Sequence, residues 1–284
     1  MHPALAVSII HLMVMSPLVS TLRVCDQFRT PPHGTTRETL TAWEAHDQQL
    51  LDYISSVIPE ALAHTGSTAF DHHLQGVQQI LRHWNASSKL CDAGLFHSIY
   101  GTEGYQGFKL SLAHRPAIQQ LIGKEAERLV WIFCMLDRYS LDQSLYVLNE
   151  PQQSRRRFEL KSRPELGQFP IVLRDEDEWL DFIELSLADW LEQVEGASEK
   201  KNPLFEWEKG EAWSYRRLAY SKMADILVQR RGLTIARDTF HAIYAMEPET
   251  TRHLHQEITP PMSQAAKEAR EALKYRDQSC EENQ

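Results

Sequence analysis

"FDHHLQGVQQILRHW", residues 70–84, contains the pattern on which the fold prediction rests. Its apolar side chains follow one another at steps of four, three, four and three residues: Phe70, Leu74, Val77, Leu81 and Trp84. That spacing places all five on one face of an α-helix. The stretch therefore predicts an amphipathic helix whose apolar face packs into a core.

The same helical period extends along most of the chain. We expect helices over residues 39–58, 88–100 and 117–136, the last interrupted near Gly123, and a strong helix that begins at the acidic run 175–177. Two strand-like pieces around a Pro-Glu-Leu-Gly turn predict a small hairpin near residues 155–173. The sequence thus predicts a mainly α fold, a helical bundle with a small β-hairpin insertion and a C-terminal helical appendage.

The expected boundaries follow from shifts in composition. Residues 1–40 are interpreted as a leader of unknown role, 41–196 as the helical domain, and 197–284 as the appendage with a polar tail. The polar stretch "EGASEKKN", residues 195–202, is the expected linker between the last two. Aromatic residues around Trp207 and Trp213 either form a surface for a protein partner or pack the appendage onto the main domain.

Composition excludes several classes of function. Hydrophobic residues make up 42% and charged residues 24% of the 284, as in ordinary globular proteins. A formal net charge of -9 opposes binding to nucleic acid. Four separated cysteines without a CxxC pair predict reduced thiols and a cytoplasmic, intracellular protein. Residues 1–22 are apolar, but Pro17 breaks them, so we expect no stable membrane span, with a signal peptide as the alternative.

Helical phase separates the two histidines in the opening stretch. His73 shares a face with Val77, Ile80 and Trp84, whereas His72 shares one with polar neighbours. His73 should therefore point inward and His72 toward water. A buried imidazole needs a hydrogen-bond partner or a metal.

Two further residues have an apolar setting. His97 is aligned with Leu90, Ala93 and Gly94, and Asp189 is surrounded by apolar residues on its predicted helix. An unpaired buried carboxylate is costly, so Asp189 should contact a cation, donors or a metal. Two imidazoles and one carboxylate from three helices suit a divalent cation, whether Mn, Fe, Zn or Mg. Asp137 competes with Asp189 for the third position.

At these residues the chain resembles the HD-domain superfamily of metal-dependent enzymes, with local likeness to stringent-response alarmone hydrolases. The likeness covers roughly residues 60–195 through four segments in order: "TGSTAFDHHLQGVQQIL", "AGLFHSIYGTEGY", "IGKEAERLVWIFCML" and "LSLADWLEQ". Residues 94–105 are also similar to the signature of an uncharacterised group of HD-like domains. The resemblance implies metal ligands at His73, His97 and Asp189.

One position departs from that pattern. The residue after the second histidine is Ser98, where the superfamily has the aspartate of its His-Asp doublet. The acidic pair that follows in alarmone hydrolases is also absent, so alarmone hydrolysis is not carried over to this chain. Glu103, on the loop beside His97, is the candidate general base, and a solvated loop acid is the alternative.

Three functions remain open from the sequence. The first is a metal-dependent hydrolase that cleaves a phosphate ester or similar bond of a small molecule. The second is a non-haem iron oxygenase acting on a small metabolite, because two histidines and one carboxylate form the facial donor set of such enzymes. The third is a catalytically inactive helical binding module, consistent with the missing aspartate.

Overall fold

The structure is a computed structural model that describes residues 23–58, 70–103, 109–146, 158–202 and 207–254. Across these ranges the fold is mainly α-helical, which confirms the predicted class. The α-helices are α1 (Arg37–Val57), α3 (Phe70–His83), α4 (Ser88–Phe96), α5 (Arg115–Ile122), α6 (Lys124–Met135), α7 (Arg138–Tyr146), α8 (Glu176–Ser198), α9 (Arg217–Arg231), α10 (Thr234–Tyr244) and α11 (Glu249–Arg252). Short 3₁₀ helices are η1 (Val24–Arg29), η2 (Leu112–His114), η4 (Pro164–Leu166) and η5 (Glu211–Ser214).

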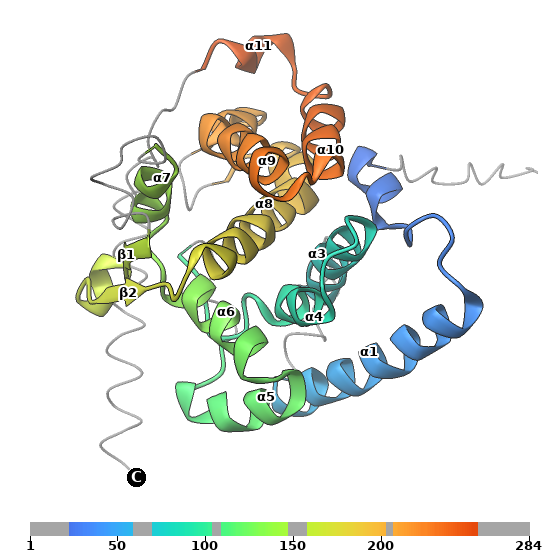
Figure 1. Ribbon diagram of the computed structural model, residues 1–284. Coiled ribbons are helices and arrows are strands. Elements are labelled where there is room, and N and C mark those ends of the chain that lie inside the picture. Colours follow the sequence, from blue (N-terminus) through green and yellow to red (C-terminus); the bar gives the residue numbers. More distant parts are fainter. Residues whose placement is uncertain (1–22, 59–69, 104–108, 147–157, 203–206, 255–284) are drawn as a thin grey trace, which may run out of the picture.

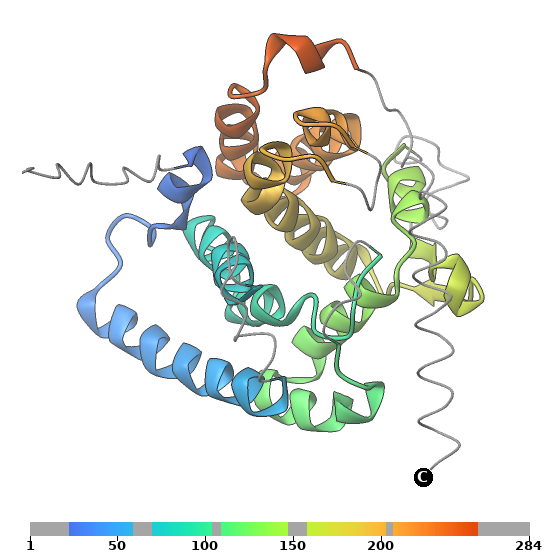
Figure 2. The ribbon, with the colours of Figure 1, turned by 180° about the vertical axis from the view of Figure 1, so that it is seen from behind.

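The long helix α8 runs through the middle of the molecule (Figures 1 and 2). It packs against α3, α4 and α6 and also against α9 and α10. Because neighbours surround it, most of its side chains are buried, including Trp179, Phe182 and Trp190. Its start matches the sequence prediction: the Asp175 carboxylate accepts the backbone N–H of Glu178 at 2.8 Å and caps the helix.

Helices α3, α4 and α6 form the wall of the bundle that carries the opening motif. The apolar face of α3 is buried as its spacing predicts, with Val77, Leu81 and Trp84 at 2% exposure or less. The predicted interruption near Gly123 is also confirmed. Gly123 has a φ of +87°, a backbone conformation that favours glycine, and it ends α5 just before α6 begins.

A small antiparallel hairpin interrupts the helices, as predicted for residues 155–173. Strand β1 (Glu159–Lys161) pairs with β2 (Pro170–Val172), and Leu160 lies opposite Ile171. These two side chains point inward and are buried, which anchors the hairpin to the core. The strands are three residues each, shorter than the segment that predicted them.

The N-terminal segment expected to be a leader divides into two parts. Residues 1–22 lie outside the described residues. Helix η1 contacts α3, α8 and α10, and Cys25 within it is fully buried. In α8, the Glu195 carboxylate accepts the backbone N–H groups of Val24 and Cys25 at 3.0 and 2.8 Å. Among the described helices, none is long and apolar enough to cross a membrane.

The linker expected at residues 195–202 is wrong in its first half, because α8 continues to Ser198. Helices α9 and α10 then turn at Gly232 and pack on α8. Trp207 and Trp213 are each 5% exposed, which confirms that they pack inward rather than forming an exposed aromatic surface. A protein partner for the C-terminal helices remains a prediction without support from these two residues.

The cysteines that the structure describes behave as buried apolar side chains. Cys25, Cys91 and Cys134 are free and buried. Burial is the largest effect on each thiol, and it raises the pKa of all three to about 12. They are therefore neutral thiols at physiological pH. Cys280 lies outside the described residues.

Candidate metal centre

Three helices bring His73, His97 and Asp189 to one point, as the sequence predicts. His73 lies in the first turn of α3, His97 directly follows the end of α4, and Asp189 lies in α8. Within the described residues these three form a group that can hold a metal ion. His97 is fully buried, and the Asp189 and His73 side chains are 5% and 21% exposed.

The helical phase of α3 separates the two neighbouring histidines as expected. His72 is exposed, whereas the His73 ring points into the bundle and stacks edge-on with the His97 ring at a centroid distance of 5.0 Å. The apolar period that predicts α3 therefore also identifies the inward histidine.

A backbone carbonyl fixes the protonation of His97. Its Nδ1 lies 2.7 Å from the carbonyl oxygen of Gly94, which can only accept a hydrogen bond. Nδ1 must therefore carry a hydrogen. In a neutral ring the other nitrogen, Nε2, then holds a lone pair, and this lone pair faces Asp189.

A second carboxylate fixes the protonation of His73. Nδ1 of His73 contacts the Glu192 carboxylate, whose other oxygen is paired with the Arg29 guanidinium. Because a carboxylate accepts hydrogen bonds, His73 donates from Nδ1. When the ring is neutral, its Nε2 holds a lone pair as well, which is directed at Asp189 and His97.

When both imidazole rings are neutral, all three converging atoms are hydrogen-bond acceptors. The Nε2 atoms of His73 and His97 lie 3.2 and 3.1 Å from Asp189 Oδ1, and 3.2 Å from each other. Atoms that lie about 2.1 Å from a shared ion, at angles of about 90° to 110°, are roughly 3.0 to 3.4 Å apart. The triangle of acceptors therefore fits a divalent cation.

The electrostatics of the site favour a positive charge at the same point. Burial disfavours the charged form of His73, but Glu192 and Asp189 outweigh burial and raise the pKa of His73 to about 10. Burial also opposes ionisation of Asp189, yet His73 and His97 hold the pKa of Asp189 well below its usual range. A proton on His73 Nε2 and a divalent ion are alternative sources of that charge.

Sequence reasoning missed two residues that support the ligands. Glu192 orients His73, and the side-chain amide of Gln193 donates to Asp189 Oδ1 at 3.0 Å. Partners of this kind hold metal ligands in place in many metalloproteins. Glu192 follows Asp189 by three residues, so helical spacing alone puts it on a similar face of α8 and could have identified it.

The close approach of Glu192 to α3 depends on a glycine. A Cβ at position 76 would lie 2.8 Å from Glu192 Cγ and 3.0 Å from Arg29 Cζ. Gly76 therefore leaves the space in which Glu192 reaches His73 and Arg29 reaches Glu192.

The remaining candidates lie around this centre in different roles. Ser98 is buried beside His97. The Glu103 carboxylate accepts the backbone N–H of Arg138 at 3.1 Å, at the start of α7. Asp137 accepts the backbone N–H of Tyr139 at 3.1 Å, so its side chain caps α7 and does not join the ligand group. Asp189 thus takes the third position for which Asp137 competed.

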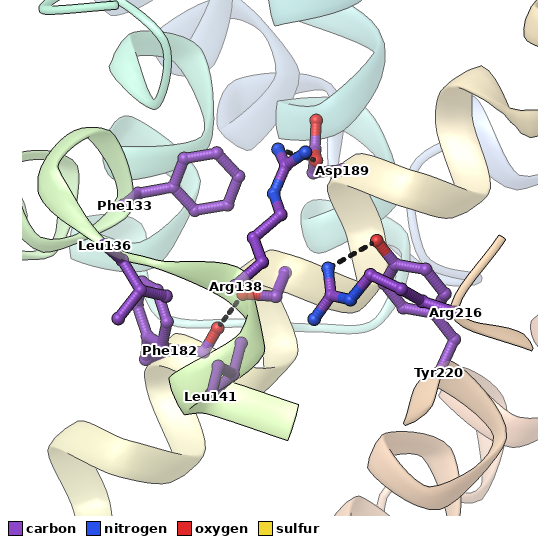
Figure 3. Close-up of a pocket in the computed structure, with 9 residues that line it drawn as sticks. Phe133, Leu136, Arg138, Leu141, Phe182, Asp189, Arg216 and Tyr220 are labelled. Atoms are coloured by element: carbon purple, nitrogen blue, oxygen red, sulfur yellow. Dashed lines mark hydrogen bonds and ion pairs between the residues drawn. The ribbon is translucent and has the colours of Figure 1, made fainter. Parts of the chain in front are cut away.

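A pocket opens beside Asp189 (Figure 3). It has about 250 Å³ of empty space, including its open mouth. Its lining combines an apolar wall with several polar side chains: Phe133, Leu136, Leu141, Phe182, Ser186, Arg138, Asp189, Arg216 and Tyr220. The enclosed part of the pocket has room for about one water molecule next to Asp189, and a larger ligand would occupy the open mouth.

Comparisons with known proteins match only part of the chain. No curated protein and no solved structure matches it. A family model described as a domain of unknown function, DUF6817, matches residues 53–138. This segment contains His73 and His97, whereas Asp189 lies beyond it.

Proposed function

We propose that this protein is a metal-dependent enzyme of HD type that acts on a small molecule and hydrolyses a phosphate ester or similar bond. The proposal rests on the convergence of His73 Nε2, His97 Nε2 and Asp189 Oδ1, which lie 3.1 to 3.2 Å from one another. When both rings are neutral, none of these three atoms is a hydrogen-bond donor. A divalent ion held there would lower the pKa of a water molecule and polarise a phosphoryl oxygen.

The chain's own residues supply the other requirements of hydrolysis. Glu192 and Gly94 hold the two imidazoles so that both Nε2 atoms face Asp189. A substrate would bind at the open mouth of the pocket beside Asp189. We assign Glu103 as the group that takes a proton from water. Its carboxylate accepts the backbone N–H of Arg138, and Arg138 lines the pocket.

The donor set itself favours a second candidate, a non-haem iron oxygenase. Two histidines and one carboxylate around a single metal are typical of such enzymes. Ser98 suits this alternative, because a mononuclear site does not require the additional carboxylate of a His-Asp doublet.

Metal analysis of protein purified without chelator tests the proposal. We expect about one equivalent of a divalent metal in the wild type and in His72→Ala, and loss of that metal in His73→Ala. The two substitutions are a matched pair, since the residues are adjacent on α3 and only His73 points into the bundle. Manganese, zinc or magnesium with phosphatase activity supports the hydrolase, and iron supports the oxygenase. Wild-type protein without metal would indicate an inactive helical module and contradict the proposal.

Glu103→Gln tests the assigned proton acceptor. The amide oxygen can still accept the N–H of Arg138, so metal content and melting temperature should stay unchanged. Turnover should fall by about 100-fold or more. Unchanged turnover would show that Glu103 is a structural loop residue.

A further inference from the structure

The pocket beside the candidate metal centre has two arginines on its wall, and they differ in their partners. Arg216 is committed to the fold: its guanidinium forms a forked ion pair with the Asp142 carboxylate and donates to the Tyr220 hydroxyl at 2.9 Å. Both Arg216 and Asp142 are almost fully buried. Their charges therefore cancel within the wall.

The Arg138 side chain forms a hydrogen bond with Tyr215 but has no forked pair with a carboxylate. Its Nη2 lies 4.0 Å from Asp189 Oδ2, too far for a hydrogen bond, and Figure 3 shows its side chain extending toward Asp189. Glu103 binds the backbone N–H of Arg138 rather than closing a fork on its guanidinium. The Phe133 ring centroid lies 6.0 Å from the guanidinium carbon.

Arg138 is nevertheless a permanent, largely desolvated cation. Its side chain is 15% exposed. Burial opposes the charge, but Tyr215, Tyr220 and Asp189 overcome burial and raise the pKa of Arg138 above its ordinary value. The position is also fixed, because Arg138 is the first residue of α7 and its backbone is held by Glu103.

Charges around the pocket leave an excess of positive charge when a metal is present. The Arg29–Glu192 pair and the Arg216–Asp142 pair each sum to zero. A divalent ion and Arg138 would carry three positive charges, and the carboxylates of Asp189 and Glu103 would offset two of them, which leaves one positive charge in excess beside Arg138. Buried cations of this kind require an anion, and the planar fork of an arginine matches a phosphate or carboxylate group.

We propose that Arg138 is the binding residue for an anionic group of the substrate, a phosphate or a carboxylate, at the wall of the pocket next to the candidate metal centre. This inference rests on the proposed function and names its substrate class: a small organic anion. The apolar wall formed by Phe133, Leu141 and Phe182 contacts the carbon part of the same molecule.

Titration calorimetry with inorganic phosphate, and separately with acetate, tests the inference on wild type, Arg138→Met and Arg138→Lys. Each protein is titrated both loaded with metal and after treatment with chelator. We expect binding of one of the anions to weaken at least about tenfold in Arg138→Met. Arg138→Lys should show a smaller loss, because lysine keeps the charge but not the fork. The anion that binds indicates whether the substrate carries a phosphate or a carboxylate.

A matched control is Arg230→Met, which removes an arginine that is 43% exposed and far along the chain on α9. Its anion affinity should equal that of the wild type. Equal affinity in wild type and Arg138→Met, or no binding of either anion to the wild type, overturns the inference. If Arg138→Met does not fold, as judged by circular dichroism, an unchanged affinity in Arg138→Lys overturns it instead.

Metal content, measured on the same samples, keeps the two proposals distinguishable. Metal-loaded wild type that binds neither anion contradicts the role of Arg138 and leaves the metal site standing. Wild type without metal contradicts the proposed function, while an Arg138-dependent anion affinity in that protein still supports the anion site.

Discussion

At the scale of single residues, Glu192 decides how His73 presents its lone pair. We predict that Glu192→Gln weakens divalent-metal binding by about tenfold, and Glu192→Ala by up to about 100-fold, because the first keeps an acceptor for Nδ1–H and the second removes it. Metal titration with a competing chelator measures both. Glu199→Gln, a change at an acid whose side chain is 56% exposed, is the control and should bind as the wild type. Equal affinity in all four proteins would mean that Glu192 does not orient the ligand.

The sequence identifies the ligands but not their supports, for a physical reason. His73 and Asp189 stand out because an imidazole or carboxylate on an apolar helix face needs a partner. Glu192 and Gln193 occupy an ordinary polar stretch of α8, and Arg29 lies in a segment that has no clear pattern. Helical spacing places Glu192 on a similar face to Asp189, but its contacts with His73 and Arg29 form only when η1, α3 and α8 meet, which no local spacing encodes.

At the scale of helices, Gly76 allows α3 to pack closely against Glu192 of α8. We predict that Gly76→Ala lowers the free energy of unfolding by about 1–3 kcal/mol and weakens metal binding, since its Cβ would meet Glu192 Cγ at 2.8 Å. The gain of about 1 kcal/mol in helix propensity opposes this loss but does not cancel it. Urea unfolding and metal titration are the measurements.

Gly196 provides the matched control within α8. A Cβ there would meet only the terminal guanidinium atoms of Arg23 at 2.8 to 2.9 Å, and a flexible side chain can move. Gly196→Ala should therefore be neutral or stabilise by up to about 1 kcal/mol. A loss equal to that of Gly76→Ala would show that both effects come from helix geometry rather than from the site.

The contact between α8 and α9 should make stability depend on pH. Burial raises the pKa of Glu184 to about 7 against 4.5 when unfolded, although Arg231 opposes the shift with a contact of 2.8 Å. A raised pKa means that the folded state binds the proton more tightly, so this contribution is present below pH 4.5 and is lost as pH rises through 7. Relative to Glu184→Gln, the wild type should lose about 3 kcal/mol between these values. Urea unfolding at pH 4.5 and 7.5 gives the difference, and a difference that is independent of pH would contradict the shift.

Helix α8 extends into the stretch that the sequence predicts to be a linker. Gly196 and Ser198 have the composition of a turn, yet α8 continues through both. The helix persists because Glu195 binds the backbone of η1 and the Arg23 guanidinium lies against Gly196. Both contacts come from residues 170 or more positions away in the sequence, which local composition does not reveal.

At the scale of the whole molecule, the C-terminal helices share the core of the metal centre. The indole N–H of Trp190 donates to the Tyr244 hydroxyl at 2.9 Å, and that of Trp84 donates to Thr239 at 3.0 Å. We therefore predict that the main bundle and α9–α10 unfold in one transition. Far-ultraviolet circular dichroism and tryptophan fluorescence should give the same midpoint in a thermal melt. Two separate midpoints would show that the appendage folds independently.

Fold class was predictable at this scale, because the helical period is strong in nearly every segment and the hairpin has its own turn signal. The order of helices around α8 was not. Their arrangement depends on which buried faces match, and several faces are equally apolar, as for the stretches that become α4 and α6.

The chain of contacts from Arg29 through Glu192 to His73 joins the N-terminal segment thermodynamically to the metal centre. By linkage, an ion that favours one placement of His73 must also favour the docked state of η1, and the reverse holds with the same free energy. Hydrogen exchange can observe this coupling, since the amides of Val24 and Cys25 are held by Glu195 on the next turn of α8. Occupancy of the site should slow exchange at those two amides, and a partner that pulls η1 away should release the ion.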